Sequence, residues 1–106
     1  MTVFTKTLVY EAAAAATDEL IGELSVEKGA KITILELAFK LDSAGHIDGY
    51  LVDAKVDEVD YELMPGINER VVVNRVMSEG EKHRWIGTIG AAGTMIVYVV
   101  YDKVKG

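Results

Sequence analysis

The chain has no cysteine, no glutamine, a single proline and only two histidines among its 106 residues. Without cysteine it can form no disulfide scaffold, no thiolate metal site and no cysteine nucleophile. The scarcity of Cys, Gln and Asn beside plentiful Glu and Lys is typical of proteins from thermophiles, although sampling in so short a chain gives the same result. The composition excludes thiol chemistry and is compatible with a thermophilic origin.

Signals for nucleic-acid binding, export and membrane insertion are also missing. The formal net charge is −6, whereas binding a nucleic-acid backbone needs clustered Lys and Arg. The first residues lack the basic region, apolar core and cleavage site of a signal peptide. No apolar run approaches the roughly 20 residues that span a bilayer as a helix. We therefore expect cytoplasmic synthesis, with neither nucleic acid nor membrane as a partner.

The residues that are abundant favour β-structure. Half of the chain is hydrophobic, which supports a buried core and argues against disorder. The β-branched residues Val, Ile and Thr make up more than a quarter of the sequence, and such residues favour strands. The length fits a single domain, which we place at residues 1–106.

Alternation of apolar and polar residues predicts seven or eight strands and no helix longer than a turn or two. Strands at this spacing are typical of an all-β, two-sheet antiparallel sandwich with jelly-roll or other Greek-key topology. We expect strands at 2–11, 20–26, 30–41, 68–77, 82–89 and 94–104, with two more inside 47–63. Turn residues separate them at 27–29, 42–46, 64–66, 78–81 and 90–93.

Two segments depart from simple alternation. The five alanines at 12–16 favour an extended or loosely coiled crossing, with a short helix as the alternative. Within 30–41 the apolar residues change parity. A change of parity inside a strand predicts a β-bulge or a sharp bend.

The segment 47–63 also changes parity, at Asp57 and Glu58. We expect a bend or tight turn there, with one strand before it and one after it. The alternation places Asp53, Lys55 and Asp57 on the solvated face of the first of these strands, because their neighbours are apolar.

The segment 94–101 (TMIVYVVY) is the most apolar part of the chain. It is too short to cross a membrane as a helix and too apolar to have one face in water. It predicts a strand that is covered on both faces, within a sandwich or between subunits. The three valines at 71–73 predict another buried strand. Strands as apolar as these need covered edges, and identical subunits packed side by side supply a cover.

Motifs for catalysis or cofactor binding are weak. The glycines of 87–93 have the spacing G-x-x-G-x-x-G and precede a strand, so no helix N-terminus can hold a pyrophosphate. The acidic residues between 48 and 62 do not form a calcium loop and alternate as on solvated strands. None of the three serines lies in a G-x-S-x-G elbow. We expect no catalytic residue, no metal site, no cofactor and no enzymatic activity.

The two histidines carry little information by themselves. His46 has Asp42 and Asp48 nearby in the sequence, so a ligand pair is conceivable, but a loop histidine is usually idle in solvent. His83 precedes Trp85 by two residues on the same strand face, where it either stacks on the indole or reaches water.

Three large amphipathic residues, Trp85, Tyr98 and Tyr101, lie near the C-terminus. Wide rings with a polar edge suit a subunit interface or a sugar-binding platform, and they equally suit core packing. The sequence leaves these three alternatives open.

The order of features resembles small jelly-roll or β-sandwich structural modules of phage and archaeal-virus particles. The similar features are the V-E-K-G turn at 26–29, the long strand from Lys31, the S-E-G-E turn at 78–81 and the final strand opening G-T-M-I-V at 93–97. The resemblance implies a subunit of a capsid, vertex, turret or appendage, incorporated into a virion. It carries no catalytic residues.

The leading expectation is a non-enzymatic, self-associating structural subunit. Its partners would be other copies of itself, as a homo-oligomer, and other structural proteins of the same assembly. The alternative is a small binding module for a carbohydrate or another small ligand. A cupin-like enzyme is a third hypothesis, against which the presence of only two histidines argues.

Overall fold

The computed structural model describes residues 2–61 and 70–105, and these residues form eight β-strands and no helix. In chain order the strands are β1 (Val3–Ala12), β2 (Ala16–Ser25), β3 (Ala30–Leu41), β4 (Gly45–Leu51), β5 (Ala54–Asp60), β6 (Arg70–Met77), β7 (Lys82–Ile89) and β8 (Gly93–Lys105). Since the described part of the chain has no helix, it has none that is long and apolar enough to cross a membrane.

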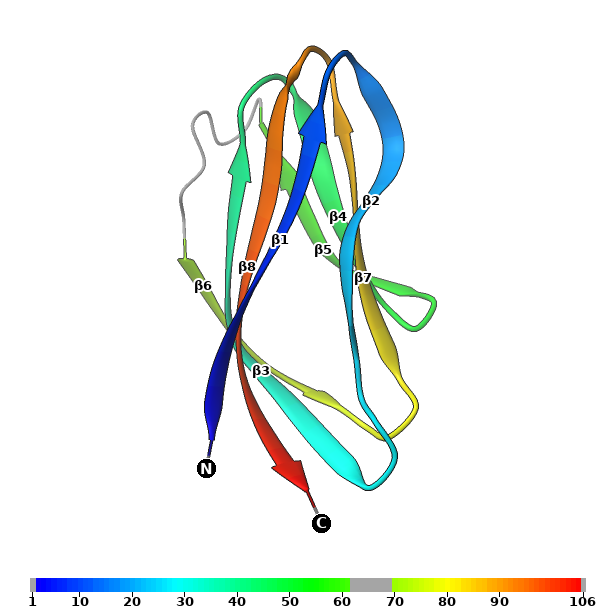
Figure 1. The fold of residues 1–106 in the computed structure, drawn as a ribbon, viewed down its shortest axis with the longest axis vertical. Coiled ribbons are helices and arrows are strands. Elements are labelled where there is room, and N and C mark those ends of the chain that lie inside the picture. The colour runs from blue at the N-terminus through cyan, green and yellow to red at the C-terminus, as the bar shows by residue number, and fades with distance from the viewer. Residues whose placement is uncertain (1, 62–69, 106) are drawn as a thin grey trace.

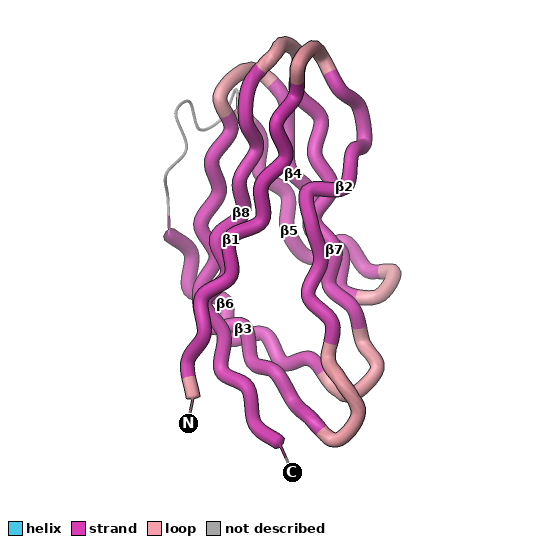
Figure 2. Tube along the Cα trace, viewed as in Figure 1, coloured by secondary structure: helices cyan, strands magenta, loops and turns pink. Residues whose placement is uncertain are grey.

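The strands form two four-stranded sheets that face each other (Figures 1 and 2). Sheet A has the order β1-β8-β3-β6, and sheet B has the order β2-β7-β4-β5. All hydrogen-bonded neighbours are antiparallel. The principal extents are 44 × 21 × 21 Å. The predicted all-β, two-sheet antiparallel sandwich is confirmed, and its topology is like that of a jelly roll.

The chain changes sheet at nearly every connection. Only β4 and β5 follow one another within a sheet, through a tight turn at Val52 and Asp53. The first and last strands pair along their length, from Val3 opposite Asp102 to Ala12 opposite Gly93. Both ends of the chain lie at the same end of the sandwich (Figure 1). Each sheet is therefore held together by strands that are far apart in sequence.

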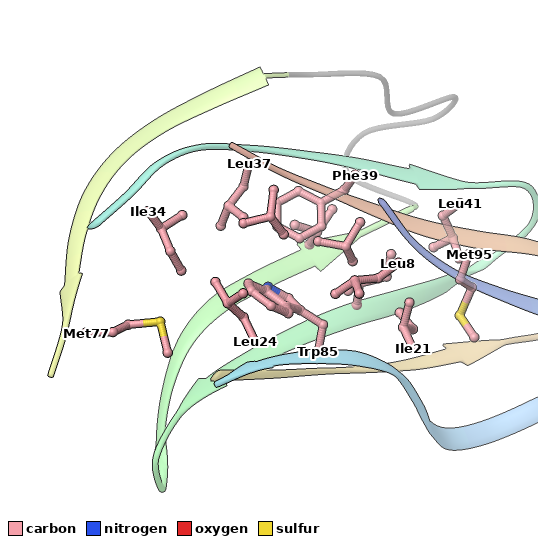
Figure 3. Close-up of a cluster of buried hydrophobic side chains, with 14 of the residues drawn as sticks. Leu8, Ile21, Leu24, Ile34, Leu37, Phe39, Leu41, Met77, Trp85 and Met95 are labelled. Carbon is pink, nitrogen blue, oxygen red and sulfur yellow. The ribbon is translucent and has the colours of Figure 1, made fainter. Parts of the chain in front are cut away.

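Alternate side chains of both sheets meet in one hydrophobic core (Figure 3). Each large apolar side chain that is fully buried contributes roughly 1.5–3 kcal/mol to folding. Trp85 is 0 % exposed and lies within this cluster. The other fully buried apolar side chains are Ile34, Leu37, Leu41, Ile47, Met77, Ile89, Met95, Val97 and Val99.

The irregular places predicted from the first part of the sequence are found. In β3 the pairing passes from Ile34 to Glu36, so Leu35 is the extra residue of a β-bulge, which explains the change of parity. The alanine segment 12–16 contains no helix: Ala12 ends β1, Ala16 begins β2, and the chain bends between them. Gly29 has φ 79° in the turn before β3, a conformation that favours glycine.

The prediction for the turn within 47–63 was wrong. The turn lies at Val52 and Asp53, five residues before the predicted position, and β5 runs through Asp57 and Glu58. Val52 has φ 57°, an unusual value for a β-branched residue, and its N–H donates to the carbonyl of Lys82 at 3.0 Å. Apolar alternation gives no sign of such a turn.

The buried strand expected at 68–77 is instead an edge strand where the structure describes it. Val72 of β6 is 65 % exposed, and Val71 and Val76 are also exposed. The turn at 78–81 joins β6 to β7 and so connects the two sheets rather than closing a hairpin. The turn predicted at 64–66 lies outside the described residues.

Candidate functional site

Four side chains form a buried polar cluster at one edge of the sandwich. Asp57 comes from β5, Arg75 from β6, and His83 and Trp85 from β7. Exposed side-chain fractions are 9 % for Asp57, 15 % for Arg75 and 0 % for His83. Since β5 is an edge of sheet B and β6 is an edge of sheet A, the cluster joins the two sheets. We refer to these four residues as the polar cluster.

The Asp57 carboxylate is the common acceptor of the polar cluster. Arg75 donates from Nη1 to Oδ2 and from Nη2 to Oδ1, both at 2.9 Å, in a two-pronged ion pair. The indole Nε1 of Trp85 donates to Oδ2 at 3.2 Å. A two-pronged pair of an arginine and a carboxylate has strong hydrogen bonds. Each group also neutralises the charge of the other, which would be costly to bury alone.

His83 completes the polar cluster as a neutral acceptor. Arg75 Nη1 donates to His83 Nε2 at 2.8 Å, so the proton of the neutral ring is on Nδ1. Burial lowers the pKa of His83 to about 4, the Asp57 carboxylate opposes this shift, and the Arg75 guanidinium adds to it. The buried Nδ1 has no hydrogen-bond partner. The ring stacks on Trp85, with centroids 3.9 Å apart and planes 13° apart.

A glycine makes room for the carboxylate. Gly49 of β4 pairs with Asp57 on one side and with Trp85 on the other. A Cβ on Gly49 would overlap the carboxylate of Asp57. The Asp57 side chain therefore crosses β4 over this glycine to reach the indole of Trp85.

A β-bulge explains why Asp57 faces inward. Gly49 pairs with Asp57 but the next residue, Tyr50, pairs with Lys55, so Val56 is extra. The bulge puts Lys55 on the outer face and Asp57 on the inner face. The prediction that Asp57 lies on the solvated face beside Lys55 was therefore wrong. Sequence reasoning missed Asp57, Arg75 and the role of Gly49, because the change of parity at Asp57 and Glu58 was interpreted as a bend or turn, whereas the structure has a bulge at Val56.

The second charged group lies on the outer face of sheet B. His46 Nδ1 is 3.0 Å from Asp48 Oδ2, and Lys55 Nζ is 3.5 Å from Asp48 Oδ1. The Asp48 carboxylate raises the pKa of Lys55. Asp42, the other expected neighbour of His46, instead accepts from the N–H of Thr94 at 3.0 Å. No group of three or more metal-binding side chains occurs within 2–61 and 70–105.

The two histidines do not converge, because β-strand alternation places His46 on the outer face of sheet B and His83 on the inner face. The three aromatic residues singled out from the sequence also lie apart. Trp85 is in the core and is inaccessible to a ligand or another subunit. Tyr101 stacks on Phe4, with centroids 5.4 Å apart. Tyr98 is half-buried on the opposite side of β8 from the core residues Val97 and Val99.

Most side chains on the outer face of sheet A are uncharged. On its central strand β8, Met95, Val97 and Val99 point into the core, so the half-buried Ile96, Tyr98 and Val100 point outward. Sheet B thus covers only one of the two faces of this strand. By register the outer face also includes Val3, Val9, Ala38, Val72, Val76 and Val104, four threonines (Thr5, Thr7, Thr33, Thr94), and the charged residues Glu11, Lys31, Glu36, Lys40, Arg70 and Asp102.

A groove of about 440 Å³ lies on the outer face of sheet A. Its lining includes Tyr98, Val100 and Thr5 together with Arg70 and Glu36. Arg70 Nη1 is 3.7 Å from Glu36 Oε2, and the Arg70 side chain is 73 % exposed. An aromatic ring and an accessible guanidinium therefore share one surface depression.

The outer face of sheet B is more polar. A groove of about 890 Å³ there is lined by the carboxylates of Asp18, Glu23, Asp53, Glu79 and Glu81 and by only two cations, Lys82 and Arg84. The same groove has a small apolar floor that includes Leu20, Val52 and Ile86. The two outer faces thus differ in chemistry, because uncharged side chains predominate on sheet A.

Comparisons with known proteins identify relatives in fold only. No protein-family model matches the sequence, and no curated protein matches it significantly. The nucleoplasmin-like core of Drosophila NLP, studied for pentamer formation and histone binding, is 12 % identical with a TM-score of 0.50; 99 % of this chain and 100 % of that chain are covered. This similarity confirms the β-sandwich.

Two further structures match less well. The nucleoplasmin-like N-terminal domain of Drosophila FKBP39 is 13 % identical with a TM-score of 0.46, covering 93 % of this chain and 87 % of that one. The Podospora anserina GH26-CBM35 β-(1,4)-mannanase is 13 % identical with a TM-score of 0.46, covering 94 % of this chain and 28 % of that one. None of these three structures is a virus-particle protein, so they do not support the resemblance to such modules.

Removing the guanidinium tests whether the polar cluster holds the two sheets together. Arg75→Ala leaves the buried Asp57 carboxylate without its ion pair, which should cost about 3–5 kcal/mol of unfolding free energy. Arg70→Ala is the matched control, since its exposed pair with Glu36 should contribute less than about 1 kcal/mol. Urea denaturation followed by circular dichroism measures both. Equal effects of the two substitutions would contradict the structural role of Arg75.

The contact between Gly49 and Asp57 gives a second prediction. Gly49→Ala should cost about 1–3 kcal/mol, because the new methyl group displaces the carboxylate from Trp85. In an Asp57→Ala background the same change should cost less, since the carboxylate is gone and only the Cβ of residue 57, at 2.9 Å, still lies close to the new methyl group. A double-mutant cycle of unfolding free energies measures this coupling. Additive costs would show that Gly49 does not serve to accommodate Asp57.

Proposed function

We propose that this chain is a non-enzymatic, self-associating structural subunit that uses the outer face of sheet A to contact other copies of itself. The observation that carries this proposal is the central strand β8. Its inner residues Met95, Val97 and Val99 are fully buried, whereas its outer residues Ile96, Tyr98 and Val100 also carry large apolar groups but are only half-buried in the single chain. A contiguous exposed apolar face is typical of an interaction site.

The distribution of exposed valines supports the same surface. Val3, Val9, Val72, Val76 and Val104 are between 47 % and 65 % exposed, and all belong to the outer face of sheet A. Charged side chains on that face are placed mainly toward its ends and its β3–β6 side. Packing against a second subunit would remove this apolar surface from water, which is the main driving force of obligate interfaces.

The organisation of the buried charges supports a non-enzymatic role. Asp57 and Arg75 pair with each other inside the sandwich and do not line either of the two grooves described above. The described surface therefore offers apolar side chains for contact, and the buried ion pair does not line a cleft.

A closed ring of several copies is the assembly that we propose. The Drosophila NLP core, which shares the fold, is described as forming a pentamer. A ring needs two different patches on each subunit. The apolar floor formed by Leu20, Val52 and Ile86 on sheet B is a candidate for the second patch. Placement of such a ring in a virus capsid, vertex, turret or appendage rests on the sequence resemblance alone, and a thermophilic origin rests on composition alone.

The oligomeric state tests the proposal directly. Light scattering at micromolar concentration should give a mass that is at least twice the 11.5 kDa of one chain. Val72→Lys, on the outer face of sheet A, should weaken association at least about tenfold, since each 1.4 kcal/mol is one decade. Val56→Lys is the matched control, because Val56 lies on the edge strand β5, away from this face. A strictly monomeric wild-type chain would refute the proposal.

The groove beside Tyr98 favours a second candidate function, the binding of a carbohydrate or another small polar ligand. An aromatic ring supplies a stacking surface for a sugar, and an exposed guanidinium supplies hydrogen-bond donors. Tyr98 and Arg70 line this groove together.

Ligand binding and self-association make opposite predictions for this groove. Titration of soluble oligosaccharides, followed by NMR, should shift resonances around Tyr98 and Arg70 in the wild type but not in Tyr98→Ala. Tyr50→Ala, on the outer face of sheet B, is the control and should leave binding intact. If Tyr98→Ala lowers the measured mass and no oligosaccharide causes shifts, the groove belongs to the subunit interface.

A further inference from the structure

The two open edges of the sandwich are joined in different ways. At one edge β1 and β2 follow each other in the chain, and Lys6 Nζ of β1 donates to the carbonyl of Glu23 on β2 at 3.2 Å. At the other edge lie β5 and β6. Within residues 2–61 and 70–105 each has a single hydrogen-bonded neighbour, β4 and β3 respectively, and the polar cluster bridges them across the two sheets.

We propose that Arg75, Asp57 and His83 form an acid-sensitive latch between the edge strands β5 and β6. The latch is closed when Arg75 is inserted between Asp57 and His83, and it opens when Arg75 withdraws and water reaches His83. This is a conformational device built into the fold, and it operates in a single subunit.

The closed state requires a neutral His83. Its Nε2 accepts the hydrogen bond from Arg75 Nη1 at 2.8 Å, and a protonated ring has no lone pair there to accept it. A second positive charge at this distance from the guanidinium also repels it. Protonation of His83 and insertion of Arg75 are therefore mutually exclusive in the observed geometry.

Burial and the Arg75 guanidinium lower the pKa of His83, and the Asp57 carboxylate and the backbone of Arg84 offset this shift only in part. Asp57 Oδ2 is 3.6 Å from Nε2, but this oxygen already accepts hydrogen bonds from Arg75 and Trp85. Among the described residues, the cross-strand neighbours on the same face are Leu24 of β2 and Leu51 of β4, which are uncharged. Asp57 from β5 and Arg75 from β6 are thus the charged groups that face the ring, and Nδ1 is buried without a partner.

The direction of the pH dependence follows from linkage. In the closed state the pKa of His83 is lowered from 6.5 to about 4, whereas in the open state the ring regains its ordinary pKa. Between these values the open state binds the extra proton, so acid favours opening and neutral pH favours closure. The closed–open equilibrium should shift about tenfold per pH unit across this window, up to about 300-fold in total.

β6 is the strand that such an opening would release. Its ladder with β3 is interrupted between Arg75 and Val72, where Asn74 has φ 46°. Val71, Val72 and Val76 are exposed, so the inward anchors of this strand are Arg75, the buried Met77 and the half-buried Val73. Segments with few buried contacts and an exposed ladder open first.

One consequence rests on the proposed function. Val72 and Val76 belong to the outer face of sheet A, so release of β6 would alter the self-association surface and make the assembly dissociate in acid. The latch itself does not depend on self-association, and its test below gives the same readings for a monomer.

Hydrogen exchange between pH 7.5 and pH 4 tests the latch on the intact chain. After correction for intrinsic exchange rates, β6 amides should become less protected as pH falls below about 6.5, while amides of the central strand β8 should not. The emission of Trp85, the one tryptophan of the chain, should change over the same range. NMR titration of the imidazole protons identifies which histidine is responsible.

Two matched variants separate the latch from general acid effects. His83→Gln keeps an acceptor for Arg75 but cannot titrate, so the pH dependence of β6 protection should disappear. His46→Gln removes the other histidine, which is 40 % exposed on the outer face of sheet B, and should leave the dependence unchanged. If β6 opens equally in acid with His83→Gln, the proposal is wrong.

The wild-type titration decides the outcome even where His83→Gln fails to fold. A His83 resonance that titrates near 6.5 without loss of β6 protection would overturn the latch. Loss of β6 protection in acid with an unchanged molecular mass would support the latch and contradict only its link to self-association. A molecular mass that falls in acid while β6 stays protected would contradict the latch and would show that the assembly dissociates in acid for another reason.

Discussion

The burial of one face of sheet A against one face of sheet B is the constraint on which the rest of the structure depends. It requires inward side chains to be apolar and inward charges to be paired, because an unpaired charge in the core is costly. Most positions meet this requirement with Val, Ile, Leu and Met. Asp57 meets it only because Arg75 and Trp85 satisfy its oxygens. The glycine at position 49 and the bulge at Val56 both accommodate this one carboxylate inside the sandwich.

Much of the fold could be predicted from alternation because alternation reports the inward face of each strand. Strand β3 has the bounds expected for it, and the bulge at Leu35 was visible as a change of parity. The alternation could not reveal which strands pair or what covers their outer faces. It also misplaced the β4–β5 turn, because Val52 adopts a backbone conformation that its side chain disfavours. Buried and edge strands with the same valines look alike in sequence, as β6 demonstrates.

The polar cluster could not be predicted because it forms from three strands of two sheets. Its members at positions 57, 75, 83 and 85 share no motif, and the bulge reverses the parity by which Asp57 would be judged. The one local sign was the spacing of His83 and Trp85, which suggested stacking and is found as such. Asp57 and Arg75 lie on edge strands of different sheets and meet only when the two sheets pack together. The site can therefore be recognised only once it is known that these two edge strands lie side by side.

The placement of polar and apolar groups in this chain is partly reversed relative to a simple globular domain. Paired charges lie inside at the β5–β6 edge, while valines lie outside on sheet A. A buried ion pair adds little net stability compared with apolar side chains of the same volume, whereas exposed valines lower solubility unless they are covered. Both features become useful if the edge must adjust when copies of the chain meet, because an ion pair specifies the position of β6 and the valines supply the contact. In that arrangement the buried Asp57–Arg75 ion pair determines where the exposed valines of β6 lie.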